Sequence, residues 1–211
     1  MLLYFSGWLF KQSRSMNPTP NPSVEPVYFL GGTMREGVMM KRAILILAVV
    51  MLLGGRVSAQ SVAPIVSEAT IEAPVEAVWA AWTTSDGLRA WLAPHAETEL
   101  RLGGLMRTNY NAKGALGDPG TIENTILSFE PKRMLSIKVS KAPQGLPFPN
   151  AIHQMWTVLY FEPQGPDRTL LRVVGLGFEP GEESQKMRAF FEQGNEATLK
   201  QLQNHFSKTR R

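Results

Sequence analysis

Residues 120–141, GTIENTILSFEPKRMLSIKVSK, contain two runs of strand-forming residues separated by a short turn. The runs cover residues 120–130 and 133–141, and only Pro131-Lys132 lies between them. A connection this short joins antiparallel strands, because parallel strands need a crossover of roughly a dozen residues or more. This stretch therefore predicts part of an antiparallel sheet.

Similar runs continue on both sides of this stretch. We expect further strands at residues 69–73, 96–102, 105–111, 152–162 and 169–177. Turns and loops rich in Gly and Pro separate these runs, and the Gly103-Gly104 pair is typical of a hairpin. The chain is thus predicted to form one antiparallel sheet of six to seven strands.

Helices are expected at both ends of this run of strands. Pro74 suits the first position of a short helix after the first strand, and Ser85 or Asp86 is expected to cap a second one. Residues 182–207 are predicted to form one long amphipathic helix with an acidic start and a basic end. This order indicates an α+β fold of the helix-grip type, in which a curved antiparallel sheet wraps around the long C-terminal helix.

Residues 40–59 have the three-part pattern of a secretory signal peptide. Lys41-Arg42 gives a basic start, residues 43–53 are an unbroken apolar run, and Val57-Ser58-Ala59 offers a cleavage site of small residues. The apolar run is shorter than the roughly 20 residues that a transmembrane helix needs. We expect cleavage between Ala59 and Gln60, and therefore a protein exported to the periplasm or the cell exterior. An uncleaved membrane anchor is the alternative.

Residues 1–39 do not resemble a domain, because prolines crowd residues 18–26 and no strand or helix period is sustained. Since a signal peptide normally begins a chain, we expect a misplaced start codon here, with a disordered extension as the alternative. The predicted organisation is then a signal peptide at 40–59, a linker at 60–66 and one domain at 67–208.

The composition argues against nucleic-acid binding. Residues 1–59 hold six Lys or Arg and two Glu, which accounts for the whole net charge of +4 and leaves residues 60–211 near neutral. The chain has no cysteine, which excludes disulfides, a lipoprotein anchor and thiol catalysis. We expect no nucleic-acid partner and no membrane contact beyond the signal peptide, and the sequence leaves the oligomeric state open.

Few residues suit metal binding or catalysis. His95, His153 and His205 stand far apart without a paired spacing, so no metal site is expected. The chain has no Gly-x-Ser-x-Gly stretch for a nucleophilic serine. Glu97 and Glu99 fall on one face of a predicted strand, which is typical of the solvated side of a sheet. The sequence therefore predicts neither a cofactor nor a catalytic residue.

Motifs in order along residues 67–206 resemble one known family. Residues 71–74, Ile-Glu-Ala-Pro, precede Val78-Trp79 and Trp82-Thr83, and Arg101-Leu102-Gly103-Gly104 follows, with Leu102 in place of a usual proline. Together with residues 120–123, 131–135 and 169–178, they resemble the START-like (SRPBCC) superfamily, within it the group of the activator of heat-shock protein 90 ATPase. The resemblance implies a helix-grip fold with a cavity between the sheet and the long helix.

Two positions depart from the pattern of that family. Gly175 stands where the last strand often carries a histidine facing the cavity, and Gly194-Asn195 replaces a common Gly-Trp in the last helix. No polar role of the missing histidine or tryptophan is therefore expected in this chain.

The content of aromatic residues and Met supplies candidates for the lining of the implied cavity. A dry void of about 300 Å³ would cost up to ~7 kcal/mol, so such a space is filled by side chains, water or an apolar ligand. The apolar candidates are Trp82, Trp91, Met106, Tyr110, Met134, Met155, Trp156, Tyr160, Phe190 and Phe191, and the polar ones are Arg107, Asn124 and His153. A plain packed core is the alternative interpretation.

The expected function is binding of a small hydrophobic molecule by an exported START-like domain, with no catalysis assumed. A cyclase-like or hydrolase-like enzyme on the same scaffold is one alternative, and it would need convergent polar residues in the cavity. A co-chaperone that activates an ATPase is another, as the family name implies. The signal peptide argues against the co-chaperone, because that chaperone and its ATP are cytosolic. Fold alone does not choose among these functions.

Overall fold

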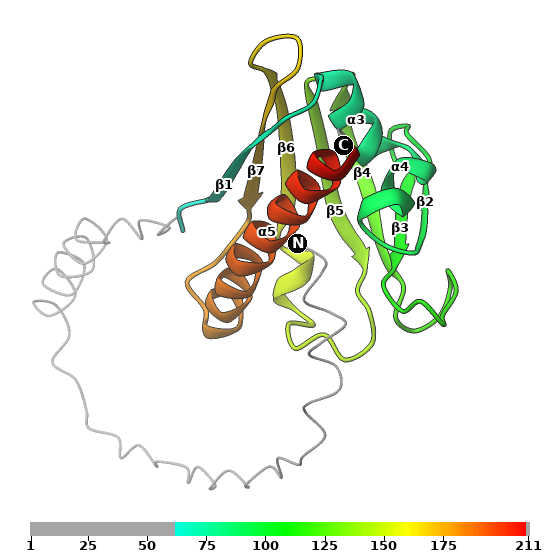
Figure 1. Ribbon diagram of the computed structural model, residues 1–211. Helices are drawn as coiled ribbons and strands as arrows, with labels where there is room; N and C mark the ends of the chain where they lie inside the picture. The colour runs from blue at the N-terminus through cyan, green and yellow to red at the C-terminus, as the bar shows by residue number, and fades with distance from the viewer. Residues whose placement is uncertain (1–61, 210–211) are drawn as a thin grey trace, which may run out of the picture. The chain divides into compact units, whose positions relative to one another are not determined.

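Seven strands form one antiparallel sheet in the computed structural model, which describes residues 62–209 (Figure 1). The strands are β1 (Ile65–Ile71), β2 (His95–Thr98), β3 (Leu105–Asn109), β4 (Ile122–Glu130), β5 (Met134–Lys141), β6 (Trp156–Pro163) and β7 (Thr169–Leu176). Their order across the sheet is β1-β7-β6-β5-β4-β3-β2. Strands β2 to β7 are neighbours in the sheet and in the chain, while β1 pairs with β7 at the other edge.

Helices α3 (Val75–Thr83) and α4 (Ser85–Trp91) follow β1, and α5 (Glu182–Thr209) follows β7. The cap of α4 is Thr84, whose hydroxyl oxygen accepts a hydrogen bond from the backbone N–H of Gly87 at 3.0 Å. Ser85 and Asp86, predicted as caps, lie inside the helix instead, so that prediction was wrong. Thr84 takes the role because its extended backbone directs the hydroxyl at the free N–H groups of the first turn.

Helix α5 runs across one face of the sheet, as Figure 1 shows. Its apolar residues are buried in two clusters. Leu199 and Leu202 belong to the first cluster, together with residues of α3, α4 and strands β4 to β7. Met187 and Phe191 belong to the second, together with Ile65 of β1 and the segment around the short 3₁₀ turn η1 (Ala151–His153). Burial of one helix face along both clusters holds the sheet against α5.

The strands bury alternate side chains. In β7, Thr169, Leu171 and Val173 are buried while the residues between them are partly exposed, and β4 shows the same alternation at its start. Because successive side chains of a strand point to opposite faces, these buried residues share the face covered by the helices. We call this the inner face and the opposite one the outer face.

The predicted α+β helix-grip fold is confirmed, with small shifts at element ends. β1 begins at Ile65, so the last two residues of the predicted linker 60–66 pair with β7. Residues 151–153 form η1 rather than the start of β6. Within residues 62–209, none of the helices is long and apolar enough to cross a bilayer. The predicted signal peptide, its cleavage site and residues 1–39 lie outside the described residues.

Candidate functional site

A small cavity lies between the inner face of the sheet and helix α5. Its volume is about 20 Å³. Eight residues line it: Trp82 of α3, Ile137, Thr157, Leu159 and Val173 of the sheet, and Asn195, Thr198 and Leu199 of α5. Most of them belong to the first cluster, whereas Thr157 pairs with Gly175, which in turn pairs with Ile65 of the second. The cavity therefore lies where the two clusters meet.

Strand pairing brings the sheet residues of the lining together. Ile137 of β5 is directly opposite Thr157 of β6, and Leu159 of β6 is directly opposite Val173 of β7. Thr157 and Leu159 are two residues apart and share the inner face. Three adjacent strands thus form an almost wholly apolar wall.

Helical spacing brings the α5 residues of the lining together. Asn195, Thr198 and Leu199 are three and four residues apart, which places them on one side of the helix. The Thr198 hydroxyl donates a hydrogen bond to the carbonyl oxygen of Gly194 at 2.8 Å. The helix itself therefore satisfies the hydroxyl of Thr198, and Asn195 provides the polar group on this side.

Two residues of the cavity lining carry buried polar atoms of opposite character. Trp82 is 5% exposed and Asn195 is 3% exposed. Among residues 62–209, neither the indole Nε1 of Trp82 nor the side-chain Oδ1 of Asn195 has a hydrogen-bond partner. The indole nitrogen can only donate, and the amide oxygen can only accept. The walls of the cavity therefore contain one unpaired donor and one unpaired acceptor, but both atoms are buried beneath its surface, which is apolar.

More polar groups without partners lie on the inner face towards β3 and β4. Asn124 is fully buried between its cross-strand neighbours Met106 and Val139, and neither amide atom of Asn124 is paired within the described part of the chain. The hydroxyls of Thr108 and Tyr110 are buried and unpaired in the same sense. Burial raises the pKa of Tyr110 well above its ordinary value. Tyr110 is therefore a neutral group.

Formal charge is absent from the interior of the described residues. No Asp, Glu, Lys, Arg or His within residues 62–209 is buried. The same residues contain no group of His, Cys, Asp or Glu that could hold a metal ion. An ionised ligand would therefore find no opposite charge to compensate for its lost hydration. The arrangement suits a neutral molecule with a large apolar part.

Several residues predicted from the sequence do lie in the interior. Trp82, Trp91, Met106, Met155, Phe191 and Asn124 are buried, and Tyr110 and Phe190 pack against the clusters. Trp91 contacts Trp82 edge-on with 5.0 Å between ring centres, and its Nε1 donates to the carbonyl oxygen of Ala81 at 2.9 Å. Of these predicted residues, Trp82 alone lines the small cavity, and the others form the core around it.

Met134, Trp156 and Tyr160 lie on the outer face, so their predicted place in the cavity was wrong. Met134 and Tyr160 are cross-strand neighbours, and Tyr160 is 37% exposed. The reason is the alternation of the strands. Leu135 and Leu159, the neighbours in sequence, take the inner positions and are buried, which forces the larger residues beside them outward.

Arg107 and His153, predicted as polar residues of the cavity, also lie outside the interior. The Arg107 guanidinium forms an ion pair with Glu97 at 2.9 Å on the outer face. His153 is exposed in η1. A polar side chain is stable in these positions because it stays in contact with water or with an ion-pair partner.

Asn195 is one of seven lining residues that the sequence interpretation missed, and its side-chain oxygen has no partner in residues 62–209. The sequence does contain a signal for Asn195. It is a polar residue on the mostly apolar side of the predicted long helix, at the position where the family commonly has tryptophan. Gly175, the other departure, lies on the inner face under Phe178. A Cβ atom built on Gly175 would lie 3.2 Å from the Phe178 ring. Phe178 therefore occupies the space beside this position.

The cavity is much smaller than an ordinary ligand pocket, which measures about 300–1,000 Å³. With about 20 Å³, it has room for one oxygen atom of water size, because a water needs at least about 10–15 Å³. Side chains fill the rest of the interior in this conformation. The sequence analysis named side chains, water and an apolar ligand as the three possible contents of the implied cavity, and in this conformation side chains take most of the space.

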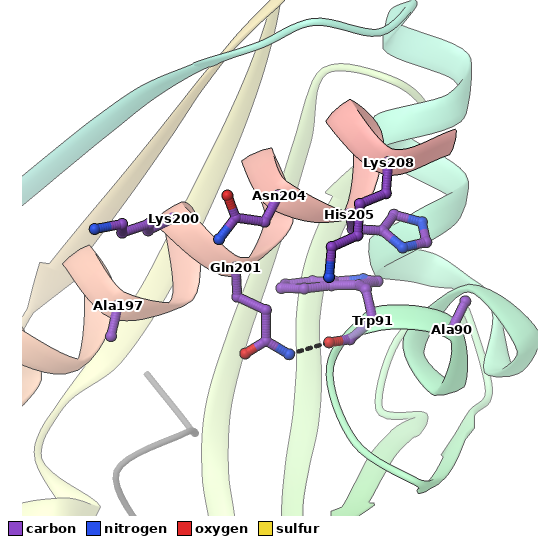
Figure 2. Close-up of a pocket in the computed structure, with 8 residues that line it drawn as sticks. All are labelled: Ala90, Trp91, Ala197, Lys200, Gln201, Asn204, His205 and Lys208. Carbon is purple, nitrogen blue, oxygen red and sulfur yellow. Dashed lines mark hydrogen bonds between the residues drawn. The ribbon is translucent and has the colours of Figure 1, made fainter. Parts of the chain in front are cut away.

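A larger groove opens at the surface between α4 and the C-terminal half of α5 (Figure 2). It measures about 630 Å³ and is lined by Ala90, Trp91, Ala197, Lys200, Gln201, Asn204, His205 and Lys208. Figure 2 shows the Gln201 side-chain nitrogen donating to the backbone oxygen of Trp91, which joins the two helices. Because the groove is open to solvent and bordered by Lys200 and Lys208, it suits a small neutral molecule less well than an enclosed site does.

Comparison with known proteins identifies the family. Residues 72–207 match the family model described as Activator of Hsp90 ATPase homolog 1-like protein. The comparison with curated proteins gives no match.

Solved structures have the same fold. A crystal structure of a Mesorhizobium loti protein is 20% identical with a TM-score of 0.54, and the match covers 70% of this chain and 98% of that one. The Aha1 dimer from Colwellia psychrerythraea is 16% identical with a TM-score of 0.54, covering 69% and 96% of the two chains. The AHSA1-like protein from Aeromonas hydrophila is 18% identical with a TM-score of 0.51, covering 70% and 94%. Since the family model spans most of the chain, this protein belongs to the family of Activator of Hsp90 ATPase homolog 1-like proteins.

Proposed function

We propose that the domain binds a small, neutral, mainly apolar molecule between the inner face of the sheet and helix α5. One observation carries this proposal: Trp82, Asn124 and Asn195 have buried polar atoms that lack partners in residues 62–209, amid apolar side chains. Each such group costs about 1–3 kcal/mol when it stays unpaired. A guest molecule with its own polar group would remove part of this cost.

Entry of a guest requires space that α5 must provide. A guest of benzene size needs about 150 Å³, and opening that volume costs about 4 kcal/mol at ~24 cal/mol per Å³. Burial of about 200 Å² of guest surface contributes about 5 kcal/mol in the opposite direction at ~25 cal/mol per Å². The two terms are close, so weak to moderate affinity is expected for the smallest guests and tighter binding for larger ones.

Two features of the sequence weaken helix α5 beside the cavity. Gly194 lies inside the helix, where glycine costs roughly 1 kcal/mol relative to alanine. The Thr198 hydroxyl bonds to the carbonyl oxygen of this same residue, an arrangement that often bends helices. We therefore propose that the N-terminal half of α5 moves about Gly194 to admit the guest.

Binding is proposed to take place outside the cytoplasm. The support is the signal-peptide pattern of residues 40–59, which would direct the domain to the periplasm or beyond the cell. A co-chaperone role, which the family description names for its members, would place the chain beside a cytosolic ATPase instead. Incubation of the purified protein with that ATPase tests this second candidate, and an unchanged rate of ATP hydrolysis would end it.

The enzyme alternative has less support from the interior. Within the described residues, the buried polar groups of the interior are amides, hydroxyls and indoles, and no carboxylate or imidazole accompanies them. General acid–base catalysis near neutral pH relies mainly on such groups. Binding without catalysis is therefore the favoured function.

Two measurements test the binding function. Native mass spectrometry of the protein purified from its own cell fraction should detect a bound small molecule. The neutral dye N-phenyl-1-naphthylamine should bind the emptied protein saturably and be displaced by the extracted molecule. Val173→Phe, which fills the cavity, should abolish dye binding, while the matched Val174→Phe on the outer face should not. Protein that is always empty, together with no saturable dye binding, would reject the proposal.

A further inference from the structure

We infer that the surface groove between α4 and α5 is a second binding site, for a small amphiphilic acid whose anionic group is held by Lys200 and Lys208. The groove and the internal cavity have no lining residue in common, so this site does not depend on the function proposed above. The two sites differ in charge: the interior favours a neutral guest, and the groove favours an anion.

The groove has the dimensions of a ligand site. Its volume of about 630 Å³ lies within the range of ordinary pockets, about 300–1,000 Å³. Its walls are the end of α4 and residues 197–208 of α5, as Figure 2 shows. The hydrogen bond from Gln201 to the backbone oxygen of Trp91 joins these two walls. The groove is therefore formed before any ligand binds.

The lining combines apolar surface with cationic groups. Ala90, Trp91 and Ala197 belong to its apolar part. The alkyl stems of Lys200 and Lys208 extend that surface, while their ammonium groups stay in water. Such a lining suits a ligand with an aromatic or aliphatic body and an acid group that keeps part of its hydration.

The charge of the lining selects an anion. Two of the eight lining residues are lysines, Lys200 and Lys208, and none of the eight is acidic. Neither lysine forms an ion pair within residues 62–209, whereas Lys186 of the same helix pairs with Glu182 at 2.7 Å. Glu196 stands at the same four-residue spacing before Lys200, yet no ion pair joins these two in the described structure. Both ammonium groups are therefore available to an acid.

A structural role explains only one of the two lysines. Lys208 is in the last turn of α5, where a cation offsets the negative end of the helix dipole. Lys200 lies about two and a half turns before the end of the helix, and the dipole effect does not extend beyond the last turn. The position of Lys200 is therefore explained better by the groove than by the helix.

A free molecule fits this groove better than a membrane lipid does. Binding to a bilayer surface needs exposed apolar residues beside the cationic ones. The large apolar residues that are exposed within residues 62–209 belong to the sheet and its turns, and none of them lies on α4 or α5. The acid group is therefore carried by a small molecule in solution.

Two dyes with the same aromatic body test the site. 1-Anilinonaphthalene-8-sulfonate is N-phenyl-1-naphthylamine with an added sulfonate, so the pair isolates the effect of the negative charge. The variants are Lys200→Gln and Lys208→Gln, alone and combined. Lys113→Gln is the matched control, because Lys113 is also exposed and has no ion pair in the described residues. Fluorescence titration measures the affinities, amide NMR signals locate the bound dye, and thermal unfolding confirms that the variants are folded.

The sulfonate dye should bind saturably and shift the amide signals of residues 90–91 and 197–208. Each lysine variant should lower its affinity about threefold and the double variant about tenfold, as expected for exposed charge pairs. Added salt should weaken it as well, because exposed charges are screened. Lys113→Gln should have no effect, and the neutral dye should respond to none of the lysine variants. Val173→Phe should leave the affinity for the sulfonate dye unchanged.

Three results would overturn the inference. The first is a sulfonate dye that does not bind saturably or binds the double variant as well as the wild type. The second is loss of its binding in Val173→Phe with amide shifts around the internal cavity, which would place the dye in the interior. The third is sedimentation with phosphatidylglycerol vesicles that requires both lysines, which would make the acid group that of a membrane lipid. The internal site is tested separately by the neutral dye, so the two proposals fail independently.

Discussion

Asn124 is a single residue that lowers the stability of the folded interior. It lies between Ile122 and Ile126 on the inner face of β4, and its amide is unpaired in the described chain. A leucine of similar size would fit the apolar surroundings without an unpaired group. Natural proteins usually retain such a cost where function requires it.

Replacement of Asn124 by leucine is predicted to raise the free energy of unfolding by about 1 kcal/mol, because an unpaired buried amide is removed. Chemical denaturation of the emptied protein measures the change, and Asn204→Leu at an exposed position serves as the control. A lower free energy of unfolding would contradict the prediction and indicate that the amide is already hydrogen-bonded in solution.

Gly177 gives a second prediction for a single residue. Its φ of +81° lies in the region that favours glycine, and a Cβ atom there would lie 2.3 Å from the carbonyl oxygen of Gln154. Gly177→Ala should therefore lower the free energy of unfolding by about 3 kcal/mol. Gly181→Ala, where no heavy atom lies within 4 Å, should change it little. Equal effects of the two substitutions would refute the steric argument.

The elements differ in how well the sequence predicts them. Strand order follows from short turns such as Pro131-Lys132, which act locally and are visible in the sequence. The face of each strand is harder to predict, because a large residue such as Tyr160 resembles a core residue until the burial of its neighbour Leu159 is known. The place of Asn195 beside the cavity needs the fold itself, since the other lining residues, such as Trp82, are distant in sequence.

Glu183 links two elements and makes their contact sensitive to pH. Its carboxylate, in the first turn of α5, accepts hydrogen bonds from the backbone N–H groups of Ala151 at 3.1 Å and Asn150 at 2.9 Å. These bonds hold the pKa of Glu183 below its ordinary value. Because the pKa is lower in the folded than in the unfolded chain, the carboxylate stabilises the fold above its ordinary pKa. This contribution is lost as the pH falls through the lowered value.

Glu183→Gln is therefore predicted to lower the melting temperature at neutral pH and to reduce its dependence on pH in the acid range. Thermal unfolding at a series of pH values measures both effects. Glu196→Gln, at an exposed position of the same helix, is the control and should follow the wild type. A Glu183→Gln profile parallel to that of the wild type would disprove the link.

For the whole molecule, the sequence predicts the fold well and the function less well. Motifs spread along the domain identified the family because turns and buried aromatic residues recur in order, and the family model confirms this. The open ligand cavity implied by the resemblance is replaced by a space of about 20 Å³. Packing at this detail depends on all side chains together, which no single motif determines.

Export is predicted to shorten the chain. When the chain is expressed in a bacterial host with the predicted signal peptide of residues 40–59 in place, the protein should be recovered from the periplasm or the medium. Intact-mass spectrometry should show Gln60 as its first residue. Ala59→Leu should retain the longer form, because the cleavage site needs a small residue. Recovery of the unprocessed wild-type chain from the cytoplasm would refute the prediction.

The division of the buried apolar residues into two clusters along α5 has a consequence for the order of local opening. The second cluster, around Met187 and Phe191, is the smaller one, so less free energy opposes transient exposure of the backbone beside it. Backbone amides of residues 184–193 should therefore exchange their hydrogens for deuterium faster than those of residues 197–206. Peptide-resolved deuterium uptake would show this as two rates within one continuous helix, whereas a single rate would mean that α5 opens as one unit.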